Sequence, residues 1–195
     1  MGGRNGRTGA QELRLHLSIL GAIVLVLWGV YLVNLLVFSR QLINLGIIPR
    51  SAVGLRGIVF APLLHDSPSH LIANTVPLVT LGWLTLLWGL REFWLTTALV
   101  MLTAGLGTWL LGAPTSVHIG ASGIIFGYFG FLLLRGYFER SVGAISLSLL
   151  VGVLYGGLMG GVVPGSSGVS WESHLFGFLG GAIAARLLTR PRPLS

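Results

Sequence analysis

Cysteine and lysine are both missing from this chain of 195 residues, and charged residues make up only 9% of it. Without cysteine the chain forms neither disulfide bonds nor metal sites with thiolate ligands. A soluble domain carries about 25% charged residues. The low charge and the mean hydropathy of +0.87 therefore indicate a membrane protein. Its net charge of +7 comes from arginines that are scattered at the ends of apolar segments. Because they form no patch, we expect no nucleic-acid binding.

Apolar segments alternate with polar or glycine- and proline-rich loops, and from them we predict an all-α membrane protein with six transmembrane helices. The predicted helices cover residues 15–38, 71–90, 93–111, 122–134, 144–163 and 174–189. The first is too long for a cleaved secretory signal. We therefore expect a membrane domain over residues 15–189 between polar tails at 1–14 and 190–195, with an apolar first loop at 40–69 in the membrane interface.

The arginines predict the orientation of this topology. With six spans, nine arginines lie on the side of the termini and three on the other side. The first group is Arg4, Arg7, Arg14, Arg91, Arg135, Arg140, Arg186, Arg190 and Arg192, and the second is Arg40, Arg50 and Arg56. Since cytoplasmic loops are enriched in basic residues, we expect both termini in the cytoplasm.

Ser122 and His174 begin the fourth and sixth predicted helices, and each precedes an arginine, Arg135 or Arg186, by 12 or 13 positions. At 1.5 Å per residue both lie about 18 Å from the arginine level, in a hydrocarbon layer about 30 Å thick. A polar pair at this depth is costly, which points to a function. A serine hydroxyl becomes a nucleophile when a base such as imidazole takes its proton. The simpler alternatives are an N-cap serine and a histidine that faces lipid headgroups.

Glycines accompany both residues. They are Gly120 and Gly123 around the serine, in G-x-S-G, and Gly177 and Gly181 after the histidine. Small residues let transmembrane helices approach closely. We therefore expect the sixth helix to pack against the fourth and to bring His174 beside Ser122. The backbone N–H of Ser122, at a helix start, is a candidate donor to an oxyanion.

His70 and Asn74 stand at i, i+4 and face one direction at the start of the second predicted helix. Such side chains are plausible oxyanion donors. The alternative is a cap cluster with an interhelical hydrogen bond from the asparagine.

The remaining polar residues suggest no further chemistry. Glu172 is two positions from His174 and should point elsewhere on a helix, so we do not assign it as a third catalytic member. We expect Asp66 to be solvated and His65 to be structural. The chain has no H-E-x-x-H motif and no acidic residue in a predicted span, so we expect no metal and no cofactor.

Together these motifs resemble the rhomboid family of intramembrane serine proteases. The match consists of H-x4-H-L-x2-N, G-x-S-G and H-x2-G-x3-G, in this order, between residues 65 and 181. The resemblance implies a Ser122–His174 dyad without an acidic member, in a water-accessible cavity that opens to the outside. It also implies an oxyanion site formed by the Ser122 N–H, His70 and Asn74, a lid at 164–172, and substrates that are transmembrane segments in the lipid bilayer. We expect a bacterial plasma membrane as the location.

The chain departs from the family pattern at two places. Gly-Leu-Arg at 54–56 stands where many members have a Trp-Arg pair, and Phe126 stands where a tyrosine often follows the serine. Phenylalanine can still stack on the ring of His174. Three alternatives to a protease remain: an inactive family member that binds transmembrane clients, a small transporter, and a scaffold.

Overall fold

The computed structural model describes residues 8–165 and 168–189, and the regular structure within them is helical. The long helices are α1 (Gly9–Leu36), α3 (Pro68–Leu86), α4 (Leu90–Leu111), α5 (Ser122–Glu139), α6 (Val142–Tyr155) and α7 (Trp171–Leu188). Shorter helices fill the loops: η1 (Gln41–Leu45), η2 (Ala52–Arg56), α2 (Gly57–Phe60), η3 (Ala61–Leu63) and η4 (Gly156–Val162). Residues 1–7 and 190–195 of the predicted tails, and 166–167 of the predicted lid, lie outside the described residues.

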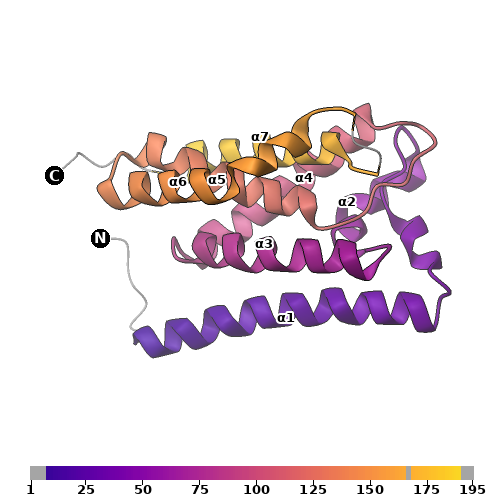
Figure 1. The fold of residues 1–195 in the computed structure, drawn as a ribbon, viewed down its shortest axis with the longest axis horizontal. Helices are drawn as coiled ribbons and strands as arrows, with labels where there is room; N and C mark the ends of the chain where they lie inside the picture. Colours follow the sequence, from indigo (N-terminus) through magenta and orange to yellow (C-terminus); the bar gives the residue numbers. More distant parts are fainter. Residues whose placement is uncertain (1–7, 166–167, 190–195) are drawn as a thin grey trace.

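The predicted all-α class is confirmed. Three helices are long and apolar enough to cross a membrane: α1, α4, and α6 together with η4 (Gly9–Leu36, Leu90–Leu111 and Val142–Val162). Helices α3, α5 and α7 have only 18 or 19 residues and lie in the same bundle (Figure 1). The number of spans beyond these three stays a prediction.

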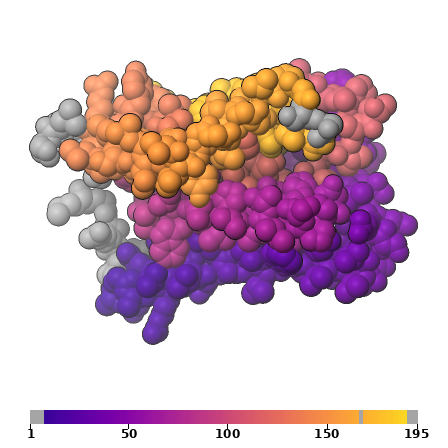
Figure 2. All heavy atoms as spheres, viewed as in Figure 1, coloured from indigo at the N-terminus to yellow at the C-terminus, as the bar shows by residue number. Residues whose placement is uncertain are grey.

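Helix α5 forms the centre of the bundle. It packs against α7, α6, α3 and α4, and most of its length is buried. Helix α1 lies along one side and packs mainly on α3, as Figures 1 and 2 show. Its buried residues include Leu20, Leu27 and Tyr31, and the indole N–H of Trp28 donates to Thr75 Oγ1 at 3.3 Å. Helix α1 is thus an outer layer, and α5 positions what the core contains.

The predicted end of the fourth helix at residue 134 is wrong. Helix α5 continues through Arg135 to Glu139. These two side chains stand at i, i+4 and form a buried ion pair, with Arg135 Nε 2.8 Å from Glu139 Oε2. The guanidinium also lies 4.0 Å from the centre of the Trp88 ring. Because the charges are paired inside the bundle, they need not face water, and the helix ends only at Arg140 in a left-handed conformation (φ 59°).

Several predicted helix starts also shift toward the N-terminus, and α3 and α4 each begin three residues earlier than predicted. Helix α1 begins at Gly9 instead of residue 15, because Thr8 and Gln11 form a capping box that satisfies its first N–H groups. Helix α7 begins at Trp171, so that His174 is its fourth residue. The apolar pattern alone could not show these starts, since the first turns contain polar residues.

Candidate active site

Ser122 and His174 meet at one end of the bundle, although they come from different helices. Ser122 is the first residue of α5, and its Oγ lies 2.8 Å from His174 Nε2. The histidine is buried and the serine is half-buried. This is the distance that direct proton transfer between a hydroxyl and an imidazole requires.

The other side of the imidazole is held by a backbone carbonyl and a ring. His174 Nδ1 lies 2.9 Å from the carbonyl oxygen of Gly161, in η4, so Nδ1 carries the proton and donates it there. Nε2 is then the acceptor that faces Ser122. Phe126 stacks on the imidazole, with ring centroids 4.0 Å apart and an interplanar angle of 7°. The sequence did not indicate Gly161, because the contact uses a main-chain carbonyl, which every residue has.

Direct contact between the backbones of α5 and α7 sets this distance. A Cβ atom on Gly177 would overlap the carbonyl oxygen of Gly123, and one on Gly181 would overlap that of Gly127. Glycines thus occupy both sides of the seam between the two helices, directly behind Ser122 and His174. Close approach of this kind is what small residues provide in membrane helices.

His70 and Asn74 converge on the turn before Ser122. A Cβ atom on Gly120 would lie 2.7 Å from His70 Nε2 and 3.4 Å from Asn74 Nδ2. Gly120 has φ +110°, which a residue with a side chain rarely adopts. As the first residue of α5, Ser122 also has an N–H without a partner inside the helix. The His70 ring, the Asn74 amide and the Ser122 N–H therefore lie around the same turn.

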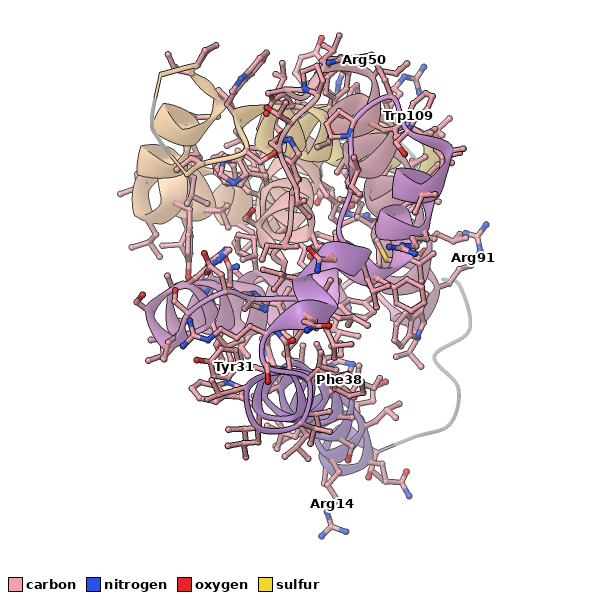
Figure 3. All side chains as sticks on the ribbon, turned by 90° about the vertical axis from the view of Figure 1, so that its right-hand side faces the viewer. Arg14, Tyr31, Phe38, Arg50, Arg91 and Trp109 are labelled. Atoms are coloured by element: carbon pink, nitrogen blue, oxygen red, sulfur yellow. The ribbon has the colours of Figure 1, made fainter. Side chains whose placement is uncertain are left out.

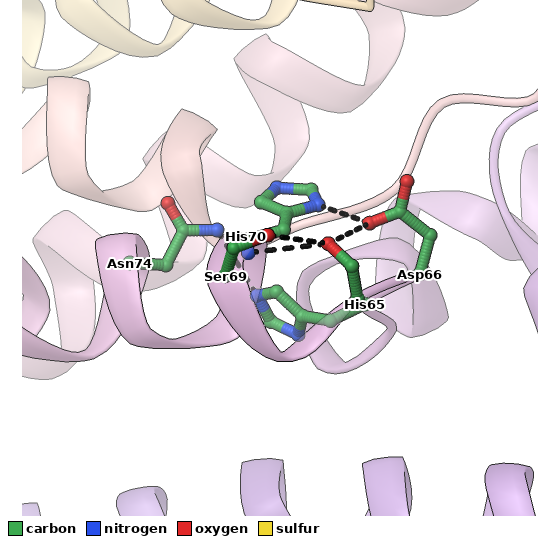
Figure 4. A network of polar contacts seen from close by, with 6 residues as sticks. His65, Asp66, Ser69, His70 and Asn74 are labelled. Atoms are coloured by element: carbon green, nitrogen blue, oxygen red, sulfur yellow. Dashed lines mark hydrogen bonds and ion pairs between the residues drawn. The ribbon is translucent and has the colours of Figure 1, made fainter.

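A polar network supports these two residues from the segment before α3 (Figure 4). Asn74 Nδ2 donates to His65 Nε2 at 3.0 Å, and His70 Nδ1 lies 2.9 Å from Asp66 Oδ1. Burial lowers the pKa of His65 to about 4, helped by the neighbouring His70. Partial burial raises the pKa of Asp66, but the hydrogen bond and charge of His70 outweigh this, so the pKa lies below its usual range. Asp66 is therefore more than a solvated loop residue.

Hydrogen bonds also tie the loops at this end together. His118 lies between Ser116 and Ser170, with 2.7 Å to each hydroxyl, and thereby joins the loop before α5 to the start of α7. Burial lowers the pKa of His118, although the charge of Glu172 acts in the opposite direction. Ser170 Oγ donates to Glu172 Oε2 at 3.4 Å. Glu172 thus accepts a hydrogen bond from Ser170, and within the described residues it forms no hydrogen bond with His174.

The first loop is fixed to the end of α4. Arg50 donates from its guanidinium to the carbonyl oxygens of Leu110 at 2.8 Å and Gly112 at 2.9 Å. The indole N–H of Trp109 donates back to Ser51 O at 2.8 Å. Figure 3 shows Arg50 and Trp109 close together at this end of the bundle. The cation satisfies carbonyl groups at the negative end of the helix dipole.

Comparison with known proteins identifies the family. The family model of the rhomboid domain matches residues 52–191, which is most of the chain. This chain belongs to the rhomboid family. An uncharacterized protein of Mycobacterium tuberculosis is 46% identical over 177 residues, which cover 86% of this chain and 73% of the relative. An uncharacterized protein of Mycobacterium leprae is 42% identical over 190 residues, covering 91% and 75%.

A more distant relative carries a functional name. The Bacillus subtilis protein named "Putative rhomboid protease YdcA" is 27% identical over 132 residues, covering 67% of this chain and 65% of the relative. Rhomboid membership and the three long apolar helices show that the chain is an integral membrane protein.

A small cavity lies beside the start of α5, lined by the glycines on either side of Ser122 but not by Ser122 itself. Its volume is about 20 Å³, and Gly120, Gly123, Ser173 and Ala104 are part of its lining. A space of this size holds about one water molecule. A larger cavity of about 360 Å³ lies between α5 and α6, where Gly136, Arg140 and Ser148 line it, at the other end of α5 from the serine. Over the described ranges, no cluster of three or more His, Cys, Asp or Glu side chains is arranged to hold a metal ion.

Proposed function

We propose that this rhomboid is an intramembrane serine endopeptidase with Ser122 as nucleophile and His174 as general base. One observation carries the proposal: Ser122 Oγ lies 2.8 Å from His174 Nε2, while Nδ1 of the same ring donates to Gly161 O. The bond to Gly161 selects the tautomer whose free nitrogen faces the hydroxyl. The carbonyl therefore takes the orienting role that an acidic residue has in a triad.

The reaction follows from this geometry. His174 Nε2 takes the Ser122 proton as the oxygen attacks a peptide carbonyl, and a tetrahedral intermediate forms. His174 then protonates the leaving amine, and water hydrolyses the acyl-enzyme by the same route. The negative charge on the carbonyl oxygen develops next to the Ser122 N–H, Asn74 and His70. Losing one such donor typically reduces the rate by about 10² to 10³.

The substrates we propose are transmembrane segments of other membrane proteins. A carbonyl inside an intact helix is already hydrogen-bonded and shielded, so the helix must unwind locally before attack. Segments with glycine, proline or other helix-weakening residues near the outer face should be preferred.

The orientation we propose places both termini in the cytoplasm and the active site toward the outside of a bacterial plasma membrane. The structure changes the charge count that supports it, because Arg135 is paired with Glu139 inside the bundle and does not lie in a loop. The excess of arginines on the side of the termini persists without it. The start of α1 and the end of α7 also lie at the same end of the bundle (Figure 1).

Cleavage of a model transmembrane substrate in detergent or liposomes tests the proposal. Wild type should cleave, whereas Ser122→Ala and His174→Ala should not. Ser146→Ala, an exposed serine on α6, is the matched control and should cleave like wild type. A fluorophosphonate probe should label wild type and Ser146→Ala but not Ser122→Ala. Cleavage retained in Ser122→Ala would refute the mechanism.

The alternative is an inactive rhomboid that binds transmembrane clients. The same experiment separates the two functions: such a protein would capture the substrate in cross-linking but would show neither cleavage nor probe labelling. The bonded Ser122–His174 pair favours the protease, because a binding protein does not need a general base on its serine.

A further inference from the structure

Asp66 and His70 are hydrogen-bonded to each other at the edge of the candidate oxyanion site. Asp66 precedes α3, and its Oδ1 lies 2.9 Å from His70 Nδ1 and 3.2 Å from Ser67 Oγ (Figure 4). The Asp66 side chain is 60% exposed, and that of His70 30%. Because Asp66 has a pKa below its usual range, it is a carboxylate at neutral pH and only accepts hydrogen bonds. The His70 nitrogen that faces it must therefore be an N–H donor.

This bond limits what the other nitrogen of the ring can do. A neutral imidazole has one N–H, so a ring that donates from Nδ1 has a bare Nε2. His70 Nε2 is the atom that points at Gly120, beside the expected position of the oxyanion. A bare nitrogen there would repel the developing negative charge. Only a doubly protonated ring both keeps the bond to Asp66 and donates from Nε2.

We propose that Asp66 is a positioning residue for the oxyanion site, which acts by holding His70 as a doubly protonated ring with its Nε2–H directed at the oxyanion. This inference rests on the proposed protease function. Hydrogen bonds from charged donors are roughly twice as strong as those from neutral ones. The site then combines one cationic donor, His70, with two neutral donors, the Asn74 amide and the Ser122 N–H.

The surrounding groups favour this assignment of charge. Apart from Asp66, the titratable groups that face His70 are His65, from the same segment, and His174, from α7. The ring of His65 meets His70 edge-on, with centroids 5.0 Å apart, and its pKa of about 4 keeps it neutral at working pH. His174 must be neutral to act as a base. Asp66 is therefore the carboxylate that bonds His70 directly, whereas the charge of Glu172 acts on His174.

The proposal predicts a particular pH–rate profile. Cleavage by wild type should fall at both acid and alkaline pH, and the proposal ties the alkaline decline to the bond between Asp66 and His70. Asp66→Asn preserves the size and polarity of the side chain but removes the charge. In this variant a neutral His70 can carry its single proton on Nε2. The rate at the optimum should fall about five- to tenfold, and the alkaline decline should weaken or disappear.

Combining Asp66→Asn with His70→Gln shows whether Asp66 acts through His70. His70→Gln supplies an amide N–H that does not titrate, so it should remove the alkaline decline by itself. Adding Asp66→Asn to His70→Gln should change neither the rate nor the profile. Glu12→Gln, which removes a carboxylate from the start of α1, should match wild type throughout. Thermal unfolding in detergent should confirm that each variant is folded over the pH range used.

Two results would overturn the proposal. One is an Asp66→Asn profile with the shape of the wild-type profile, and the other is an equal loss of rate from Asp66→Asn in the His70→Gln background. Either result leaves Ser122-dependent cleavage by wild type intact. By contrast, a wild-type protein that neither cleaves nor reacts with the fluorophosphonate probe contradicts the protease function itself. The two failures are therefore distinguishable.

Discussion

Gly161→Ala tests whether the Gly161 segment holds the imidazole of His174 in place. A Cβ atom on this residue would lie 2.9 Å from both His174 Nδ1 and Phe126 Cζ, whereas ordinary contacts begin at 3.4 Å. The imidazole, the phenyl ring or the segment must therefore move by about 0.5 Å. Whichever moves, the ring leaves the position in which Nδ1 bonds Gly161 O and Nε2 bonds Ser122 Oγ. Since a misplacement of about 1 Å costs about 10²-fold in rate, we expect cleavage to fall about tenfold.

Gly160→Ala is the matched control, because it lies in the same 3-10 helix and its Cβ would meet nothing within 4 Å. Both variants should be assayed for turnover of the model substrate, for the rate of fluorophosphonate labelling and for thermal unfolding in detergent. We expect similar unfolding temperatures and a loss of turnover and labelling only in Gly161→Ala. Equal turnover in the two variants would show that this contact does not position His174, and the reasoning would be wrong.

Three further predictions concern single side chains. Phe126→Ala removes the ring stacked on His174 and should slow cleavage about three- to tenfold, measured as initial rate at saturating substrate. Burial lowers the pKa of His65 from 6.5 to about 4. The free energy of unfolding should therefore decrease by about 3 kcal/mol as the pH falls from 6.5 toward 4, because only the unfolded chain takes up the proton in this range. The unfolding of His65→Gln, measured over the same pH range, should lack this decrease. Glu139→Gln removes the carboxylate that Arg135 Nε bonds at 2.8 Å inside the bundle and should lower the free energy of unfolding by about 3–5 kcal/mol, measured by denaturant titration in mixed micelles.

The sequence was most informative where the proposed function depends on a side chain. Ser122, His174, His70 and Asn74 carry polar groups at the ends of apolar segments, a pattern that stands out because such groups are costly in a membrane. The structure places these residues at one end of the bundle, and Gly123, Gly177 and Gly181 lie in the seam between α5 and α7. Their catalytic roles stay a prediction until cleavage is measured.

Features that depend on tertiary contacts were beyond the sequence pattern. The predicted helix ends before Arg135, but the ion pair with Glu139 and the contact of the guanidinium with Trp88 allow the charges to lie inside a helix. Gly161 acts through its carbonyl oxygen, which every residue possesses. Asp66 was interpreted as a solvated residue, although it stands four positions before His70. That spacing is the signal that would have indicated the pair.

The seam between α5 and α7 has a consequence for how this rhomboid tolerates change. Where Gly127 meets Gly181, main chain touches main chain, so no rotamer can adjust and no neighbour can compensate for added bulk. Lipid-facing side chains, by contrast, are free to diverge as bilayers differ in thickness or composition. Mutational tolerance should therefore form a gradient across the bundle, permissive at the periphery and nearly absent along this one line of contact.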